Sequence, residues 1–266
     1  MATELKTRPQ PALGDVPQGE GVLIDDVSRA YGDRGGATVR ALAHVHLHAA
    51  HGELLAVVGP SGCGKTTLLE LICGLQSPDG GSIACAPAVL MPQRDLLLPW
   101  LSAVDNAALA LRIAGLSRTR ARGRAAALFA ELGLDGFQDA RPSELSGGMR
   151  QRVAFLRTLL SGKPVLCLDE PFGALDAITR SEMQTWLAQT LVQEPRTVVL
   201  VTHDVEEAVV LADRIAVLSP RPGRVIDELC VDLRRPRSRT DPAVIALRER
   251  ALAVLHSSAS AAGGGA

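Results

Sequence analysis

Short apolar runs alternate with helical patterns along most of the chain. The apolar run Leu54–Val58 ends in a glycine-rich turn, which is followed by a helical run from Lys65 to Cys73. Buried strands are predicted over Leu54–Val58, Val165–Leu168, Thr197–Val201 and Arg214–Leu218. Strands separated by helices imply an α/β fold with parallel pairing and helices packed on the sheet faces. Ligands of such sheets bind at the carboxyl ends of the strands, where the polar motifs of this chain lie.

The segment from Val104 to Leu160 differs, because helical patterns run through it without an intervening strand. Within Ala121–Leu132, one helical face collects the apolar residues Ala125, Leu128, Phe129 and Leu132. The pattern predicts a helical subdomain, residues 97–160, inserted into the α/β core.

The two ends of the chain differ in composition from the rest. Residues 1–20 contain prolines and glycines and few large apolar groups, which is typical of a flexible tail. Residues 257–266 are rich in Ser, Ala and Gly, which predicts a disordered tail. Asp241 and Pro242 favour a helix start before Ala243–Leu255. The folded domain is therefore expected to span residues 21–256.

Composition excludes several classes of protein. A chain of 266 residues with 47 % hydrophobic content can bury a large core. Its formal net charge of −1 argues against a protein that works mainly on nucleic acid. The apolar runs are far shorter than the roughly 20 residues that cross a bilayer, and no secretion signal is visible. Five cysteines without metal-ligand spacing are typical of reduced thiols, so we expect a soluble cytoplasmic protein.

Residues 59–67 read GPSGCGKTT and match the phosphate-loop pattern G-x-x-x-x-G-K-[ST]. Gly62 and Gly64 permit a tight turn whose N–H groups face an anion, and the following helix adds its dipole. In this pattern Lys65 reaches the β- and γ-phosphates of ATP, and the Thr66 hydroxyl coordinates Mg²⁺. The predicted nucleotide-binding residues are Gly59, Pro60, Ser61, Gly62, Cys63, Gly64, Lys65, Thr66 and Thr67.

Four further polar residues complete the candidate site. Asp169 and Glu170 lie at the end of one strand, His203 follows another, and Gln93 lies in the segment MPQRD. Asp169 can hold Mg²⁺, and Glu170 can accept a proton from the attacking water. His203 can bond the γ-phosphate or that water, and Gln93 can contact Mg²⁺ and water. An isolated acidic pair, histidine or glutamine is more often a structural or surface residue, so these roles depend on the phosphate loop. The candidate catalytic set is Lys65, Gln93, Glu170 and His203, and the metal set is Thr66, Gln93 and Asp169.

Together these motifs resemble the ATP-binding cassette (ABC) ATPases, most diagnostically at Leu145–Arg152, which reads LSGGMRQR. The resemblance covers about residues 22–255. It implies a RecA-like P-loop core with an N-terminal antiparallel β subdomain and an inserted α-helical subdomain. It also implies that Tyr31 stacks on adenine, that Gln93 is the Q-loop glutamine, that Gly173–Asp176 is the D-loop, and that His203 is the switch histidine.

The signature residues Ser146, Gly147 and Gly148 precede a predicted helix, Met149–Leu160. They offer a hydroxyl, free N–H groups and a helix dipole, which together suit a second anion site. The resemblance implies a head-to-tail dimer with a second copy of the chain. In that dimer, the signature of one subunit closes on the γ-phosphate held by the phosphate loop of the other.

Several segments are similar to importer ATPases of the nitrate, sulfonate and taurine type, and relatives for thiamine-pyrimidine precursors share them. These features are Met149, LLLPW after Gln93, GALDAITR and SPRPGRV at Ser219–Val225. The resemblance implies an ATP-hydrolysing subunit at the cytoplasmic face of the membrane, with permease partners and, indirectly, an extracytoplasmic substrate-binding protein. Leu98–Pro99–Trp100 either contacts the permease or packs internally.

Two other classes of protein share some of these motifs. A soluble ABC ATPase acting on DNA or ribosomes typically carries long coiled-coil insertions or two cassettes, and neither is present. Arginine clusters at Arg118–Arg124 and Arg234–Arg239 could suggest nucleic acid, but charge runs are usually solvated faces. A P-loop kinase would need an acceptor pocket and has no use for LSGG. The sequence therefore predicts a transport ATPase without a nucleic-acid partner.

Overall fold

A computed structural model describes residues 21–32 and 38–263, so the predicted tail at residues 1–20 lies outside the described part. The strands are β1 (Val22–Gly32), β2 (Thr38–Ala49), β3 (Leu54–Val58), β4 (Gly80–Cys85), β5 (Ala88–Met91), β6 (Val165–Asp169), β7 (Thr197–Thr202), β8 (Arg214–Leu218) and β9 (Val225–Cys230). The helices are α1 (Lys65–Ile72), α2 (Ala103–Ala107), α3 (Leu109–Ile113), α4 (Arg118–Ala126), the short 3₁₀ helix η1 (Pro142–Glu144), α5 (Gly147–Leu159), α6 (Ala177–Gln193), α7 (Val205–Leu211) and α8 (Pro242–Gly263).

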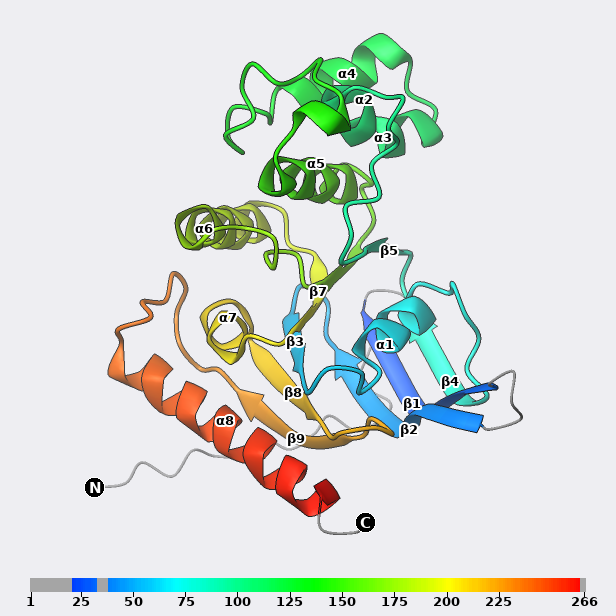
Figure 1. Cartoon of the computed structure of the whole chain (residues 1–266), viewed down its shortest axis with the longest axis vertical. Coiled ribbons are helices and arrows are strands. Elements are labelled where there is room, and N and C mark those ends of the chain that lie inside the picture. The colour runs from blue at the N-terminus through cyan, green and yellow to red at the C-terminus, as the bar shows by residue number, and fades with distance from the viewer. Residues whose placement is uncertain (1–20, 33–37, 264–266) are drawn as a thin grey trace.

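Two sheets form the lower part of the molecule, and a lobe of helices stands above them (Figure 1). The larger sheet has the order β5-β6-β7-β3-β8-β9; its strands are parallel except β9, which pairs antiparallel with β8. The smaller sheet, β2-β1-β4, is antiparallel. The four predicted strands are β3, β6, β7 and β8, and all four lie inside the larger sheet. The predicted α/β core and N-terminal antiparallel sheet are confirmed.

The interior positions of the central strands are apolar because both of their faces are buried, and their polar residues lie at the strand ends. In β3, Leu54, Ala56 and Val58 face a core shared with the helical lobe, α6, α7 and α8. Leu55 and Val57 face a second core, where α1 packs between the two sheets. The period of two in a strand thus divides one apolar run between two cores.

The helical lobe contains α2 to α5, but it is less regular than the periodicity predicts (Figure 1). The helix predicted over Ala121–Leu132 is α4, which ends at Ala126. After it, Leu128 and Phe129 donate backbone bonds to the residues three positions earlier, so the α-helical repeat is lost. Phe129 and Leu132 are still buried, which explains why their spacing looked helical.

The C-terminal helix is longer than predicted. Its expected end was Leu255, and a disordered tail was expected from residue 257, yet α8 continues to Gly263. Alanine has the highest helix propensity, so a run of small residues need not end a helix. No helix within residues 21–32 and 38–263 is long and apolar enough to cross a membrane.

The arginine cluster at residues 234–239 is structural rather than a solvated face. The Arg237 guanidinium donates to the carbonyls of Val209 (2.9 Å) and Val231 (3.2 Å), so it caps the end of α7. Arg239 pairs with Glu206 of α7 at 3.2 Å. The segment between β9 and α8 is thereby tied to the helix that follows β7.

Candidate nucleotide site

Three neighbouring strands of the larger sheet deliver the predicted motifs to one edge. The phosphate loop follows β3, Asp169 ends β6, and His203 follows β7. Val58 of β3 pairs with Thr202, and Val201 pairs with Asp169. Because these strands are parallel and adjacent, their carboxyl ends meet, as the strand pattern predicts.

The phosphate loop adopts a conformation that requires glycine at two positions. Gly62 and Gly64 have φ of 74° and 107°, in the left-handed region. A Cβ on Gly64 would lie 2.7 Å from the carbonyl oxygen of Ala41 in β2. The Lys65 ammonium donates to the carbonyls of Gly59 (2.8 Å) and Pro60 (3.0 Å), so the loop curls around this cation.

Thr66 and Asp169 form a pair of oxygen donors beside the loop. The Thr66 hydroxyl donates to Asp169 Oδ2 at 2.8 Å. Asp169 is only 4 % exposed; its burial raises the pKa of its carboxyl, against the Thr66 hydrogen bond and the charge of Lys65. No group of three or more His, Cys, Asp or Glu side chains forms a metal cluster in the described part of the chain. Mg²⁺ on a nucleotide needs only one or two protein oxygens, and a buried carboxylate beside a hydroxyl fits that cation.

Glu170 is the point at which three segments converge. Its Oε2 accepts from Gln93 Nε2 at 2.9 Å, and its Oε1 lies 3.1 Å from His203 Nδ1. Its φ of 47° is unusual for a residue with a side chain, and its N–H donates to Val201 O at 2.8 Å. Gln93, which sequence context alone supported, therefore lies with the acidic pair and the histidine.

Tyr31 of β1 stands beside the helix that follows the phosphate loop. Its hydroxyl donates to Gln76 Oε1 at 2.9 Å and lies 3.3 Å from Thr67 Oγ1. The Arg29 guanidinium carbon lies 5.1 Å from the centroid of the Tyr31 ring. Stacking of this ring on adenine stays a prediction.

The signature lies apart from the phosphate loop, in the helical lobe (Figure 1). Ser146 is the N-cap of α5, and its Oγ accepts from Met149 N at 3.2 Å. Gly147 and Gly148 form the first turn, so the helix begins two residues before the predicted start. Among the hydrogen bonds of the described residues, none joins Ser146 to the loop 59–67.

Sequence reasoning missed the residues that hold this site in place. Arg150 of the signature helix pairs with Asp95 at 3.1 Å, and Arg157 donates to the carbonyls of Asp95 (2.7 Å) and Leu96 (3.0 Å). These contacts tie the segment after Gln93 to α5. Arg150 lies inside the LSGGMRQR motif, but nothing in the sequence indicates Asp95 as its partner.

A second missed group surrounds His203. The Thr202 hydroxyl donates to Glu207 Oε2 and accepts from Asp204 N at 3.0 Å. Asp204 caps α7, since its Oδ1 accepts from Glu206 N and Glu207 N. The backbone is therefore fixed on both sides of His203. Glu207 directly follows Glu206 in a segment that reads DVEEAVVL, so nothing in the sequence distinguished it as a buried acid.

A phosphate loop, an acidic pair and a histidine at adjacent strand ends define a P-loop ATPase. The sequence model of a family described as ABC transporter matches residues 42–173. The aliphatic sulfonates import ATP-binding protein SsuB 2 of Burkholderia lata is 43 % identical over 233 residues, which cover 84 % of this chain and 82 % of that protein. The formylaminopyrimidine import ATP-binding protein ThiZ of Halalkalibacterium halodurans is 45 % identical over 194 residues, 71 % of this chain and 78 % of that protein.

A solved structure agrees with these relatives. It is a dimeric, post-hydrolysis state of an ATP-binding cassette bound to ADP and Pi, with a TM-score of 0.74 and 29 % identity. The match covers 80 % of this chain and 100 % of the solved one. The chain therefore belongs to the ABC transporter ATP-binding family, and it is an ATPase that binds ATP.

Proposed function

We propose that this chain is the ATP-hydrolysing subunit of an ABC importer, bound to permease subunits at the cytoplasmic face of the membrane. Two relatives that match most of the chain are import ATP-binding proteins. In this proposal residues 21–256 act as one ATPase domain, in which residues 97–160 form the subdomain that carries the signature.

The observation that carries the proposal is the position of the Glu170 carboxylate between Gln93 and His203. A carboxylate held by an amide on one side and an imidazole on the other is oriented to take a proton from water. His203 is 62 % exposed, so it can also reach a γ-phosphate at the sheet edge. Gln93 connects this carboxylate to the helical lobe through the segment that Arg150 and Arg157 hold.

The phosphate loop supplies the charge compensation. Lys65 leaves the carbonyls of Gly59 and Pro60 for the β- and γ-phosphates, and the glycine-rich turn offers its N–H groups. Mg²⁺, when bound, neutralises phosphate charge, and Thr66, Asp169 and Gln93 are the residues that would hold it. Residues 59–67 and Tyr31 bind the nucleotide.

The signature completes the site in a head-to-tail dimer. Ser146, Gly147 and Gly148 present a hydroxyl and a helix N-terminus but do not reach the phosphate loop of their own chain. We infer that they bind the γ-phosphate held by a second copy. The dimeric cassette bound to ADP and Pi supports this arrangement.

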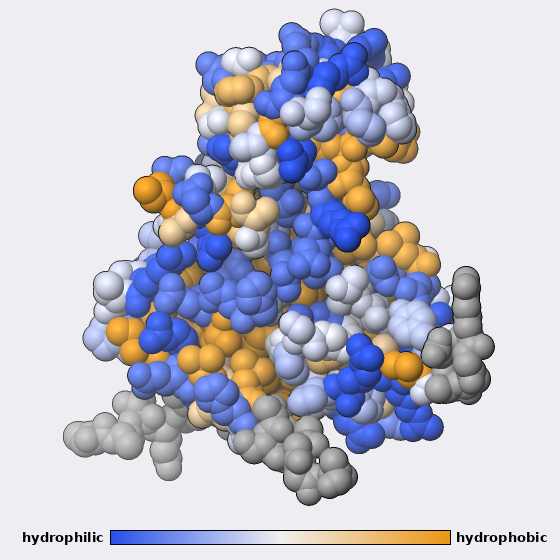
Figure 2. Space-filling view, in the orientation of Figure 1, coloured by the Kyte–Doolittle hydropathy of each residue, from blue (hydrophilic) through white to orange (hydrophobic). Residues whose placement is uncertain are grey.

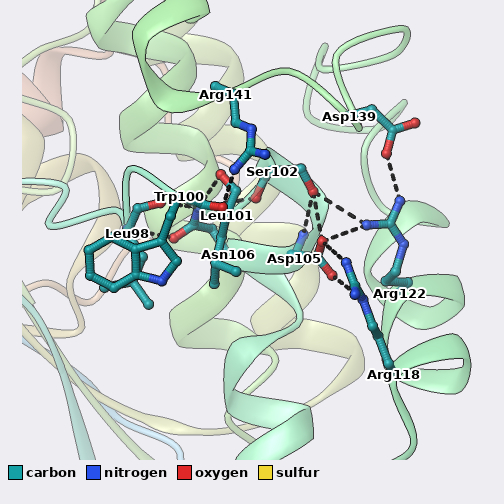
Figure 3. A network of polar contacts seen from close by, with 10 residues as sticks. All are labelled: Leu98, Trp100, Leu101, Ser102, Asp105, Asn106, Arg118, Arg122, Asp139 and Arg141. Carbon is teal, nitrogen blue, oxygen red and sulfur yellow. Dashed lines mark hydrogen bonds and ion pairs between the residues drawn. The ribbon is translucent and has the colours of Figure 1, made fainter.

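The permease is proposed to dock beside the turn that carries Trp100. Trp100 is 66 % exposed, and Leu96 and Ile113 are also exposed apolar residues. Figure 2 shows apolar residues at the lower edge of the helical lobe, on the α3 side. Figure 3 shows how the turn is held: Asn106 Nδ2 donates to Leu98 O (3.1 Å) and Ser102 O (3.0 Å), and Arg141 donates to Trp100 O.

The arginines near this turn have partners within the lobe. Arg118 and Arg122 both pair with Asp105, at 2.8 and 2.7 Å, and Arg122 also pairs with Asp139 at 2.6 Å (Figure 3). Arg118, Arg120 and Arg124 are exposed, so the cluster at residues 118–124 is largely a solvated face, and in our proposal it is not a nucleic-acid site. The ion pairs of Arg118 and Arg122 stiffen the surface that presents Trp100.

The transported solute is proposed to be small and polar, of the nitrate, sulfonate or taurine type or similar to a thiamine-pyrimidine precursor. Sulfonates and a formylaminopyrimidine are the solutes in the names of the two relatives. An extracytoplasmic substrate-binding protein completes the importer in this proposal, and the permease and that protein select the solute.

Glu170→Gln tests the proposal. The variant keeps Lys65, Thr66 and Asp169, so it should bind ATP, but it cannot take the proton and should lose at least about 100-fold in turnover. ATP should then trap a dimer, visible by size-exclusion chromatography with light scattering. Glu182→Gln, at an exposed position of α6, is the matched control and should resemble the wild type. A Glu170→Gln variant that stays monomeric with ATP, or that retains wild-type turnover, would contradict the proposal.

A further inference from the structure

The turn between β8 and β9, Ser219–Arg224, contacts the phosphate loop but contributes none of the catalytic or metal-binding residues. β8 lies next to β3 in parallel register, with Val217 opposite Val58. The turn after β8 therefore leaves the sheet at the same edge as the phosphate loop. It contains most of SPRPGRV, a segment that the sequence resemblance singled out and the nucleotide site did not explain.

The turn is fixed at both of its ends and at its centre. Ser219 N donates to Arg224 O at 2.9 Å, and the Ser219 hydroxyl accepts from Arg224 N at 3.1 Å and lies 3.0 Å from Pro222 O. Gly223 N donates to Ala41 O at 2.9 Å, and Gly223 O accepts from Ala43 N at 3.0 Å. The turn is thus joined to β2 and forms a rigid base for its side chains.

Gly62 and Cys63 of the phosphate loop both contact this turn. Arg221 Nε donates to Gly62 O at 2.9 Å. A Cβ on Gly223 would lie 2.2 Å from Cys63 O, so the turn backbone packs directly against the loop. A Cβ on Gly62 would lie 3.0 Å from Arg221 Nη2, so the guanidinium covers the outer side of Gly62.

We propose that Arg221 is a positioning residue for the phosphate loop, which holds the Gly62–Cys63 peptide in the orientation that binds the β-phosphate. In a planar trans peptide, the C=O and the following N–H point in opposite directions. Arg221 holds the Gly62 carbonyl outward, so the Cys63 N–H points into the loop, where it donates to Pro60 O at 3.3 Å. A phosphate oxygen replaces Pro60 O as the acceptor when nucleotide binds.

The guanidinium has an electronic effect in addition to the geometric one. A charged donor on a carbonyl polarises the peptide, and this strengthens the hydrogen bond that the N–H of the same peptide donates. The hydrogen bond that is strengthened is the one from the Cys63 N–H to phosphate. Proton transfer is not affected, since Glu170 and His203 follow other strands. Arg221 should therefore affect nucleotide affinity much more than turnover.

Arg224 provides a matched control in the same turn. It is an exposed arginine that carries the same charge, and its side chain makes no hydrogen bond or ion pair among those of the described residues. Replacing it removes one positive charge near the phosphates without removing the bond to Gly62. Any difference between the two variants then reports the bond rather than the charge.

The experiment compares Arg221→Gln, Arg221→Lys and Arg224→Gln with the wild type by calorimetric binding of ADP and by ATPase kinetics. Arg221→Gln should raise the Kd of ADP and the KM of ATP by about 3- to 10-fold, with kcat within about 2-fold. Arg221→Lys should show a smaller rise, because lysine keeps the charge and a donor but not the planar fork. Arg224→Gln should match the wild type.

The inference rests on the proposed roles of the phosphate loop, and the outcomes separate the two. A wild-type chain that binds neither ADP nor ATP would overturn the proposed function. Nucleotide binding by the wild type together with equal Kd values for Arg221→Gln and Arg224→Gln would overturn only the inference, as would a change in kcat alone. If Arg221→Gln melts well below the wild type, Arg221→Lys is used in its place. A Kd of ADP for Arg221→Lys equal to that for Arg224→Gln then overturns the inference.

Discussion

Lys65 is a buried cation in a loop built almost entirely of backbone groups. Its side chain crosses the turn to reach the carbonyls of Gly59 and Pro60. A buried ammonium needs such partners, and the phosphates of ATP offer stronger ones at the same place. The spacing of this lysine after Gly62 and Gly64 predicts a role at the phosphates, and its position in the loop is consistent with that prediction.

Lys65→Ala should abolish measurable hydrolysis, with a loss of more than about 100-fold in kcat/KM, because the γ-phosphate charge goes uncompensated. Steady-state phosphate release on the purified protein measures this. Lys163→Ala is the control, since Lys163 is an exposed lysine just before β6. Turnover of the Lys65 variant near that of the control would show that another cation holds the phosphates.

Glu207 is a buried acid whose state depends on the fold. It is 5 % exposed, and burial raises the pKa of its carboxyl from 4.5 to about 7, against the hydrogen bonds from Thr202 and Gln184. Asp204 raises this pKa further, and Arg180 lowers it. The folded protein thus holds a proton that the unfolded chain releases at lower pH.

The resulting pH dependence has a definite sign. A raised pKa contributes stability that is fully present below pH 4.5 and is lost as pH rises to about 7. Within this window the free energy of unfolding should fall by up to about 1.4 kcal/mol per pH unit from this group. Glu207→Gln is neutral throughout, so urea unfolding at several pH values should show a flatter profile. Parallel profiles of variant and wild type would show that the pKa of Glu207 is the same in the folded and the unfolded chain.

At the scale of elements, one side chain of α2 bonds the turn between β5 and α2 at several points. Asn106 is fully buried, and its carboxamide bonds the N–H of Leu98 at 2.8 Å and carbonyls of Leu98, Leu101 and Ser102. Together with the bond from Arg141 to Trp100 O, this residue fixes the backbone that presents Trp100. This arrangement depends on the path of the turn, so spacing in the sequence did not reveal it.

Asn106→Ala should lower the free energy of unfolding by about 2 kcal/mol or more, because several buried backbone groups lose their partner. Denaturant unfolding measures the change, and limited proteolysis should show faster cleavage between residues 94 and 102. Asp135→Ala removes an exposed polar side chain of the same lobe and should change the stability by less than about 0.5 kcal/mol. Equal stability of the two variants would mean that the turn is held by other contacts.

The buried central strands were easier to predict than the outer strands β1, β2, β4, β5 and β9, for which the pattern gave no range, and than the helical lobe. The four central strands are buried on both faces, so their apolar runs are unbroken and their ends stand out. In the helical lobe, Phe129 and Leu132 lie in a turn, yet their side chains are buried. A burial pattern alone does not distinguish a turn from a helix. At the C-terminus, composition favoured disorder over residues that continue α8.

At the scale of the whole molecule, the two anion-binding motifs lie in different parts of one chain. The phosphate loop belongs to the sheet edge, and the signature belongs to the helical lobe above it (Figure 1). Hydrolysis therefore depends on a second subunit in our proposal. The contacts of Arg150 and Arg157 with the segment after Gln93 link the two parts.

Ser146→Arg should block the ATP-dependent dimer while leaving the affinity of the monomer for ADP within about 2-fold. The bulky cation occupies the place where the second copy's γ-phosphate must dock, and Ser146 does not contact its own phosphate loop. Introduced together with Glu170→Gln, it should keep the protein monomeric with ATP in light scattering. Ser146→Ala loses only the helix cap, at a cost of about 1 kcal/mol. It therefore distinguishes the effect of losing the cap from the effect of blocking the dimer contact. Weaker binding of ADP by the Ser146→Arg monomer would place Ser146 in the site of its own chain.

The sequence by itself determined the chemistry: a phosphate loop, an acidic pair, a histidine and a signature at helix or strand ends, because each depends on local backbone geometry and spacing. The tertiary structure decided which of these meet. It brought Gln93 and His203 to the two oxygens of Glu170, pinned His203 through Thr202 and Glu207, and placed Arg221 against Gly62. Except for the Thr202–Glu207 bond, which is local, those contacts join segments that are distant in the chain, and strand order and register fix them rather than any local pattern.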